Sequence, residues 1–201
     1  MAAQLQPLPR PIAIFPQFIA RQSESIKLRE KIMSLSGDSF YIETYPSKQP
    51  LLQVKGDAFS LSGRKAVADM QGNPLFTIRK QHFSIPSTYY AEDPAGNKFF
   101  EVQGKWSLGS SKAVGVFSYR DQQTGQPREG RLFMKGDFFD RKADIKDEAT
   151  GQVVATIDRK FLNARELLGG QQTYLVTCAP GIDMALICAM CICLDERRNE
   201  N

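Results

Sequence analysis

The sequence predicts a mainly β fold in which short antiparallel strands enclose one hydrophobic α-helix near the C-terminus. Short strand-like segments fill most of the chain, and Gly, Asn, Asp and Pro separate them, as antiparallel hairpins require. The run 184–194 then contains no polar residue. A helix that is apolar on every side must be buried all round in a water-soluble protein. This run therefore predicts a helix inside β-structure.

Composition agrees with one large β domain. The chain has 201 residues, of which 42% are hydrophobic, enough for a sizeable core. The formal net charge is +4, which permits an anionic partner without requiring one. No nucleic-acid partner is expected from so mild an excess.

The N-terminal residues predict an extended arm. Pro7, Pro9, Pro11 and Pro16 exclude a helical apolar leader, so we expect no signal peptide. We place the arm at 1–20, one barrel domain at 21–196 and a polar tail at 197–201. No apolar run reaches the roughly 17–25 residues that a membrane-spanning helix needs.

Nine segments show strand patterns. In residues 142–147, for example, Ala143 and Ile145 alternate with charged side chains, which gives one apolar and one charged face. The predicted strands are 38–44, 50–55, 75–79, 99–106, 114–119, 131–135, 142–147, 152–159 and 173–178.

A short motif recurs at the predicted turns. An acidic residue is followed three positions later by glycine and then by a β-rich run, because glycine supplies the positive φ of a turn and the carboxylate accepts backbone N–H bonds. The copies are Asp69/Gly72, Asp93/Gly96 and Glu148/Gly151, with 121–125 as a looser copy.

The apolar helix is predicted at about 181–194. Asp183 falls in its first turn, where a carboxylate suits the positive end of the helix dipole. Asp195 and Glu196 fit the opposite end poorly, so we expect the helix to end near Leu194 and to emerge into solvent. Residues 162–168 predict one or two further helical turns that end at two glycines.

These features resemble the LURP-one-related family, which belongs with the tubby C-terminal and phospholipid scramblase folds. The resemblance covers about 25–196, and it is carried by Val54-Lys-Gly-Asp-Ala-Phe-Ser60, the Asp69 turn, Ile78-Arg-Lys80 and Ala179-Pro-Gly-Ile-Asp-Met-Ala-Leu-Ile187. It implies a closed, twelve-stranded antiparallel barrel around a central C-terminal helix.

The cysteines admit two interpretations. All four (Cys178, Cys188, Cys191 and Cys193) lie in the last 24 residues, and two of them form a CxxC pattern. A zinc site needs four thiolates or imidazoles that converge, whereas apolar neighbours disfavour the thiolate. Reduced, buried thiols in a cytoplasmic protein are the preferred interpretation, and no metal or other cofactor is expected.

The sequence offers no catalytic set, so we expect a protein that is not an enzyme. His82 is the only histidine, and no nucleophile motif or phosphate loop accompanies it. We interpret it as structural or exposed. Asp137 and Asp140 lie in a turn-like stretch, where capping explains them.

A basic cluster is the candidate binding site. Between residues 55 and 80 five cations stand against two anions, Asp57 and Asp69. If neighbouring strands bring the cations together, they would hold an anionic lipid headgroup; the alternative is an ordinary solvated strand face. The candidate headgroup ligands are Lys55, Arg64, Lys65, Arg79 and Lys80.

Three hypotheses about function follow. The preferred one is a non-enzymatic module, cytoplasmic or peripheral at a membrane, that binds a phosphoinositide, another anionic headgroup or a protein partner. The alternative is a scramblase-like membrane protein whose C-terminal apolar segment lies in lipid, although that segment is short. An enzyme with a site inside the barrel is the third, and the central helix leaves it little room.

Overall fold

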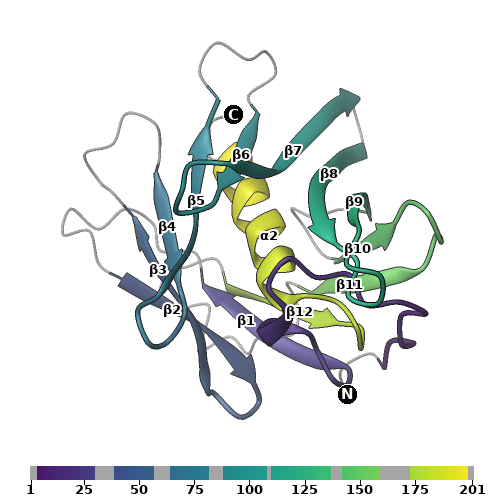
Figure 1. Ribbon diagram of the computed structural model, residues 1–201, viewed down its shortest axis with the longest axis horizontal. Coiled ribbons are helices and arrows are strands. Elements are labelled where there is room, and N and C mark those ends of the chain that lie inside the picture. The colour runs from purple at the N-terminus through teal and green to yellow at the C-terminus, as the bar shows by residue number, and fades with distance from the viewer. Residues whose placement is uncertain are drawn as a thin grey trace.

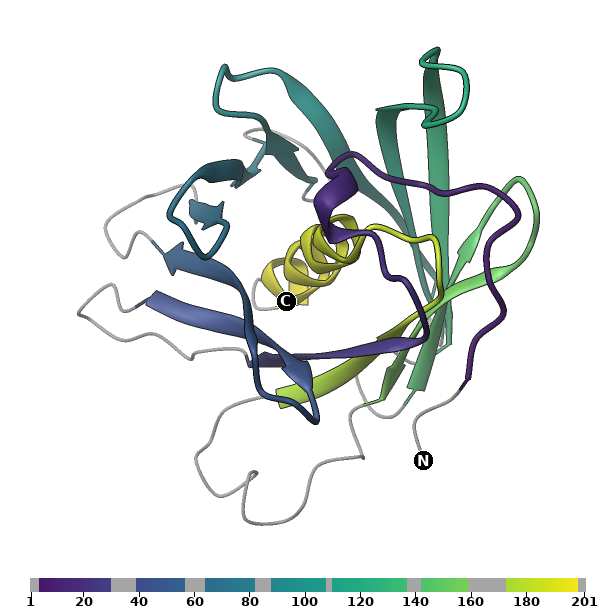
Figure 2. The ribbon, with the colours of Figure 1, turned by 60° about the horizontal axis from the view of Figure 1, so that its bottom comes forward.

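The structure, a computed structural model, describes residues 4–29, 39–56, 64–81, 88–107, 110–136, 142–158 and 173–198. These residues form one closed antiparallel barrel in which the strands follow chain order and β1 closes against β12. Helix α2 (Met184–Arg198) runs through the middle of the ring, as Figures 1 and 2 show. The fold class predicted from the sequence is therefore confirmed.

The described barrel has twelve strands, and one 3₁₀ turn, η1 (Pro16–Phe18), lies in the N-terminal segment. The strands are β1 (Glu24–Arg29), β2 (Ser39–Tyr45), β3 (Pro50–Gly56), β4 (Lys65–Ala68), β5 (Pro74–Lys80), β6 (Tyr89–Glu92), β7 (Lys98–Ser107), β8 (Ser110–Arg120), β9 (Pro127–Gly136), β10 (Lys142–Asp147), β11 (Val153–Asp158) and β12 (Thr173–Cys178).

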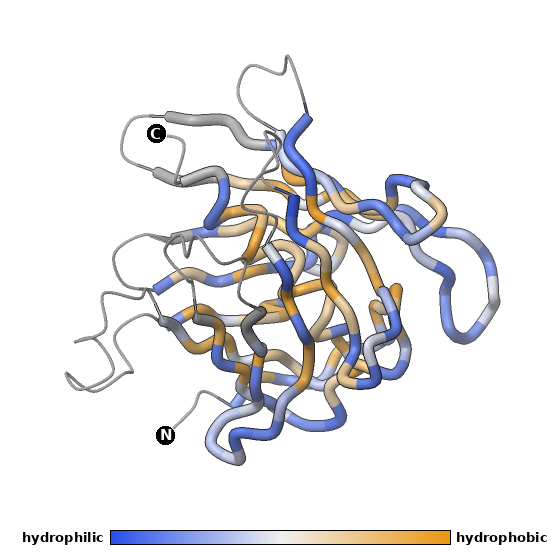
Figure 3. Tube along the Cα trace, turned by 90° about the vertical axis from the view of Figure 1, so that its left-hand side faces the viewer, coloured by the Kyte–Doolittle hydropathy of each residue, from blue (hydrophilic) through white to orange (hydrophobic). Residues whose placement is uncertain are grey.

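Strand alternation fills the barrel with apolar side chains. On β3, Leu52 and Val54 are fully buried, whereas Lys55, near the end of the strand, is exposed. On β10, Ala143 and Ile145 face the core in the same way. Figure 3 shows how apolar and polar residues alternate along the strands. The period of two in the sequence is thus the period of the barrel wall.

All nine predicted strands are present, and three further strands were not singled out from the sequence. Those three are β1, β4 and β6. Both β4 and β6 are only four residues long, and β4 carries one large apolar side chain, Val67. So short a segment gives almost no periodic signal. The helical turns predicted at 162–168 lie outside the described residues.

Helix α2 differs from the prediction at both ends. It begins at Met184 rather than near 181, because Gly181 and Ile182 lie in a turn that bonds to the arm. It continues past Leu194 to Arg198, and Asp195 is buried rather than solvated. The hydroxyl of Tyr174 on β12 donates to the Asp195 carboxylate, so the polar end of the helix has a partner inside the barrel wall.

Asp183 is the residue that positions the start of the helix. Its Oδ1 accepts the backbone N–H groups of Ala185 and Leu186 at 2.8 and 3.3 Å, which makes it the N-cap. Its Oδ2 accepts the N–H groups of Ile14 and Phe15 at 3.0 and 2.8 Å. One carboxylate therefore fastens both the helix and the N-terminal arm.

The arm lies against the barrel end at which α2 starts. Backbone bonds join Leu8 to Pro180, Ile12 to Gly181 and Ala20 to Ile182 at 2.8–2.9 Å. Phe15 stacks on Phe76 of β5 at 5.7 Å and meets Phe99 of β7 edge-on at 5.8 Å. The proline-rich segment bends at residues 9–10 and 14–15 before η1, and its apolar side chains close this end of the barrel.

The repeated turn exists in two forms. Asp69 and Asp93 each accept N–H bonds within their turn, from Asn73 and Asn97 at 2.8 Å. The third and fourth copies start one residue earlier relative to their glycines, at Asp121 and Asp147. All four glycines have positive φ, at 69–87°.

The prediction that Glu148 is the acidic member of the third copy is wrong. The Asp147 carboxylate accepts the Thr150 N–H and hydroxyl bonds at 3.2 and 2.7 Å. Glu148 instead forms an exposed ion pair with Arg131 at 3.1 Å. The motif is Asp-x-x-Thr-Gly-Gln, and the looser copy from Asp121 matches it better than the first two do.

Candidate functional site

The barrel interior is occupied by α2. Ala185 and Ala189 have no exposed surface, and a Cβ atom on Gly115 of β8 would lie 3.5 Å from the sulfur of Met190. The wall and the helix are therefore in close contact where the backbone of β8 passes. Because α2 packs closely against the wall, we expect a functional site on the outside of the barrel.

The four cysteines are free and buried. Burial raises the pKa of Cys178, Cys188 and Cys193 well above the ordinary value of a thiol, so these side chains are neutral thiols. No three His, Cys, Asp or Glu side chains among the described residues are grouped closely enough to hold a metal ion. His82, Asp137 and Asp140 lie outside the described residues.

The predicted headgroup ligands lie around the barrel end at which α2 terminates, but they do not share one face. Lys55 and Arg79 belong to the outward-facing rows of β3 and β5. Lys65 and Lys80 are half-buried and follow the inward-facing rows of Val67 and Ile78. Arg64, just before β4, is exposed.

Lys65 is engaged with the central helix. Its ammonium group forms an ion pair with the carboxylate of Glu196, and only 20% of the Lys65 side chain and 13% of the Glu196 side chain are exposed. The Tyr89 hydroxyl donates a long bond of 3.5 Å to the Glu196 carbonyl. Lys65 thus joins β4 to the end of α2. Because its charge is paired with Glu196, it is not available to a headgroup.

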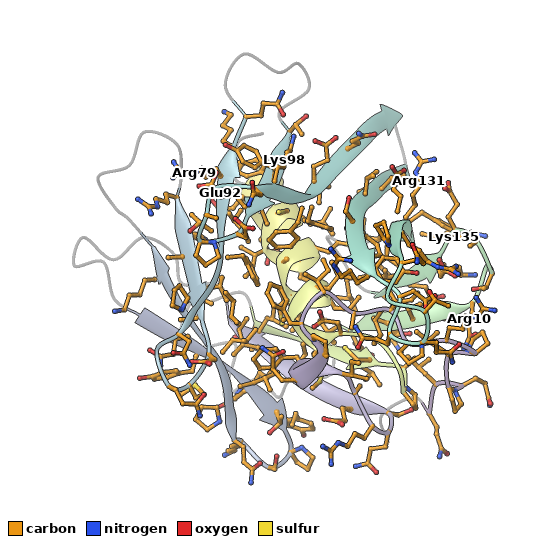
Figure 4. The ribbon with its side chains drawn as sticks, viewed as in Figure 1. Arg10, Arg79, Glu92, Lys98, Arg131 and Lys135 are labelled. Atoms are coloured by element: carbon orange, nitrogen blue, oxygen red, sulfur yellow. The ribbon has the colours of Figure 1, made fainter. Side chains whose placement is uncertain are left out.

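Arg79 is paired as well. Its Nε donates to the Glu92 carboxylate on β6, and Figure 4 shows the two side chains together on the outer surface. Nearby, Lys98 pairs with Glu101 and lies 4.9 Å from the ring centre of Tyr90. This part of the wall is a charge-paired surface, the arrangement expected of a solvated strand face.

Lys55 and Arg64 are the exposed cations of the set. Register pairs Lys55 with Ala66 and Gly56 with Lys65, so Lys55 and Arg64 flank the ends of β3 and β4. Within the part of the chain that the structure describes, neither has an ion-pair partner. The structure therefore narrows the candidate site from five cations to an exposed pair beside the end of α2.

The sequence analysis missed the two acidic partners. Glu92 stands opposite Thr77 across β5 and β6, next to Arg79, and a correct assignment of the four-residue β6 would have placed it there. Glu196 was expected in solvent because the helix was ended too early. Asp183 was correctly assigned to the start of the helix. Its bonds to the arm were missed because they join residues 168–169 positions apart in the sequence.

None of the described helices is both long and apolar enough to span a bilayer. The longest, α2, has 15 residues, which is about 22 Å at the usual helical rise. Its apolar residues lie against the inside of the barrel wall. This arrangement does not favour the alternative in which the C-terminal segment lies in lipid.

Comparisons with known proteins agree on one family. The family model described as LURP-one-related matches residues 24–195. Protein LURP-one-related 10 of Arabidopsis thaliana is 22% identical over 192 residues, which cover 94% of this chain and 97% of the relative. Protein LURP-one-related 15 of the same plant is 21% identical over 193 residues, covering 94% and 87%.

A solved structure shows the same fold. The X-ray structure of a protein from Arabidopsis thaliana superposes with a TM-score of 0.65 at 16% sequence identity, and the match covers 94% of this chain and 99% of that one. At this identity the likeness concerns the barrel and its helix.

Proposed function

This chain belongs to the LURP-one-related family, and from that premise we propose that it is a non-enzymatic binding module for an anionic phospholipid headgroup at a membrane surface. The observation that carries the proposal is the exposed pair of cations, Lys55 and Arg64, beside the end of α2. Neither cation has an acidic partner among the described residues, so both are available to a phosphate group.

We propose that the protein is not an enzyme because the interior of the barrel is occupied. The space in which a barrel protein would hold a small substrate contains α2. The nucleophilic side chains inside it are the buried cysteines, which burial keeps protonated. We accordingly propose recognition rather than catalysis.

The expected binding is weak and depends on salt. Each Lys or Arg near an anionic membrane surface contributes about 1 kcal/mol, so two cations together give about 30-fold in affinity. Interactions between exposed charges are screened over about 8 Å at physiological ionic strength. The module would therefore associate reversibly, at the periphery of the membrane.

Vesicle flotation tests the proposal. The protein is mixed with phosphatidylcholine vesicles that contain or lack phosphoinositide, at low and at physiological salt. We expect flotation that requires phosphoinositide and that falls about 30-fold in the variant Lys55→Ala/Arg64→Ala. Arg79→Ala/Lys98→Ala is the matched control, because it removes the same charge from two cations that Glu92 and Glu101 already neutralise.

Two results would overturn the lipid proposal. The first is the lack of any difference between vesicles with and without phosphoinositide at low salt. The second is an equal loss of flotation in Arg79→Ala/Lys98→Ala and in Lys55→Ala/Arg64→Ala, since this would mean that general charge rather than the exposed pair matters. Either result would turn the search to a protein partner for the same surface.

A further inference from the structure

A groove of about 660 Å³ lies on the side of the barrel opposite to the exposed cations, near the start of α2. Three segments far apart in the sequence form it. The arm contributes Leu8, Pro9, Arg10 and Ile12, the hairpin of β8 and β9 contributes Tyr119 and residues 128–131, and the turn between β10 and β11 contributes residues 147–150. Its volume is within the range of small-molecule sites.

The groove exists because the β8–β9 hairpin extends past the barrel. Residues 127–131 of β9 pair with β8 but lie beyond the last paired residue of β10, which is Asp147 opposite Leu132. The inward-facing row of this extension holds Phe117 and Tyr119 of β8. Tyr119 lines the groove together with Leu8 and Ile12 of the arm.

The floor of the groove is apolar and aromatic. The half-buried ring of Tyr119 lies 5.6 Å from the ring of Phe117, and Leu8 and Ile12 approach from the arm. The Phe117 ring lies against Gly130, where a Cβ atom would be 2.3 Å from it. Burial raises the pKa of the Tyr119 hydroxyl, so this group is a neutral hydrogen-bond donor beside an apolar surface.

The available charge in the groove is positive. Arg10 is exposed and has no ion-pair partner among the described residues. Arg128, in contrast, is paired, because its Nε donates to the Asp121 carboxylate at 2.9 Å. The Arg10 guanidinium acts on the Tyr119 hydroxyl electrostatically, as do Arg128 and the Asp121 and Asp147 carboxylates.

The acidic side chains that line the groove are already used or point elsewhere. The Asp147 carboxylate bonds Thr150 within its own turn, and Glu148 pairs with Arg131. Glu129 belongs to the outward-facing row of β9, next to Arg128 on the inward-facing row. Figure 4 shows Arg10 and Arg131 on the same side of the molecule.

We propose that this groove binds a small molecule with a flat apolar body and one carboxylate, with the body on Tyr119 and the carboxylate on Arg10. A planar guanidinium matches a carboxylate in two parallel bonds, and an aromatic floor accepts a flat body in an offset stack. This site is separate from the proposed headgroup site and does not depend on it.

Ligand-observed saturation-transfer NMR with the full chain tests the proposal. The probes are 2-naphthoate and its uncharged analogue 2-naphthamide, and inorganic phosphate is the competitor. We expect 2-naphthoate to bind at least tenfold more tightly than 2-naphthamide. Arg10→Ala should reduce this binding about tenfold, and Tyr119→Leu should reduce the binding of both naphthalene probes.

A matched variant separates the two surfaces. Arg64→Ala removes the same charge from the other end of the barrel, so it should leave 2-naphthoate binding unchanged, while Arg10→Ala should leave vesicle flotation unchanged. Equal affinities for 2-naphthoate and 2-naphthamide, no saturation transfer to either, or unaltered binding in Arg10→Ala would each overturn the proposal. Displacement of 2-naphthoate by an equal concentration of inorganic phosphate would also overturn it, because the apolar body would then contribute nothing to the affinity.

Discussion

The double role of Asp183 makes a quantitative prediction about stability. Ser at this position can still cap the helix but is too short to reach the arm, whereas Ala can do neither. Loss of the arm bonds leaves two part-buried N–H groups, Ile14 and Phe15, without an acceptor, at about 1 kcal/mol each at the lower end of the usual range. Loss of the cap costs about 1 kcal/mol more.

The lost hydrogen bonds alone should therefore cost Asp183→Ser about 2 kcal/mol and Asp183→Ala about 3 kcal/mol of unfolding free energy, before the relief of the buried charge is added to both. Both variants remove the buried charge, so the difference between them isolates the cap. Urea unfolding gives the two free energies, and hydrogen exchange reports on the arm directly.

Hydrogen exchange tests directly whether Asp183 holds the arm. The amides of Ile14 and Phe15 should lose protection to the same extent in both variants, because both lack the second carboxylate oxygen. Native protection of these two amides in Asp183→Ser would refute the double role, whatever the unfolding free energies are. A fall in m-value would instead indicate a changed denatured or native state.

Three further predictions concern the same framework. Burial raises the pKa of Asp183 to about 6 from 3.8, so the folded state binds the extra proton and stability should fall by about 3 kcal/mol as pH rises from about 4 to about 6; a pH series of urea unfolding checks this, and a curve as steep in Asp183→Ser would contradict it. Ala189→Asp puts an unpaired charge inside the barrel and should abolish cooperative unfolding by calorimetry, whereas Ala95→Asp in an exposed turn should not. Gly130→Ala places a Cβ atom 2.3 Å from the Phe117 ring and should cost roughly 1–3 kcal/mol by urea unfolding; Phe117→Leu should relieve part of this cost, and strictly additive losses would argue against the clash.

The architecture was predictable because its signals are local or compositional. Alternation such as Lys142-Ala143-Asp144-Ile145 marks a strand without reference to the rest of the chain. An all-apolar run such as 184–194 requires a surrounding wall whatever the wall's topology. The family resemblance then supplied the number of strands. The short β4 and β6 carry too few residues for either signal.

The candidate site was less predictable because charge pairing depends on register. The sequence places Arg79 and Lys80 next to each other, yet strand geometry sends them to opposite faces of β5. Glu92 and Glu196 become partners only once β6 and the end of α2 are placed. The groove beside Tyr119 depends on the arm, which no local pattern brings to the β8–β9 hairpin.

The pairing of the first strand with the last has a consequence for how the protein is made. Ribosomes deliver β1 early and β12 and α2 late, so the ring stays open during most of translation, with its apolar inner surface uncovered. Closure of the ring therefore waits until β12 has been synthesised, and the apolar inner surface of the earlier strands is exposed to aggregation until then.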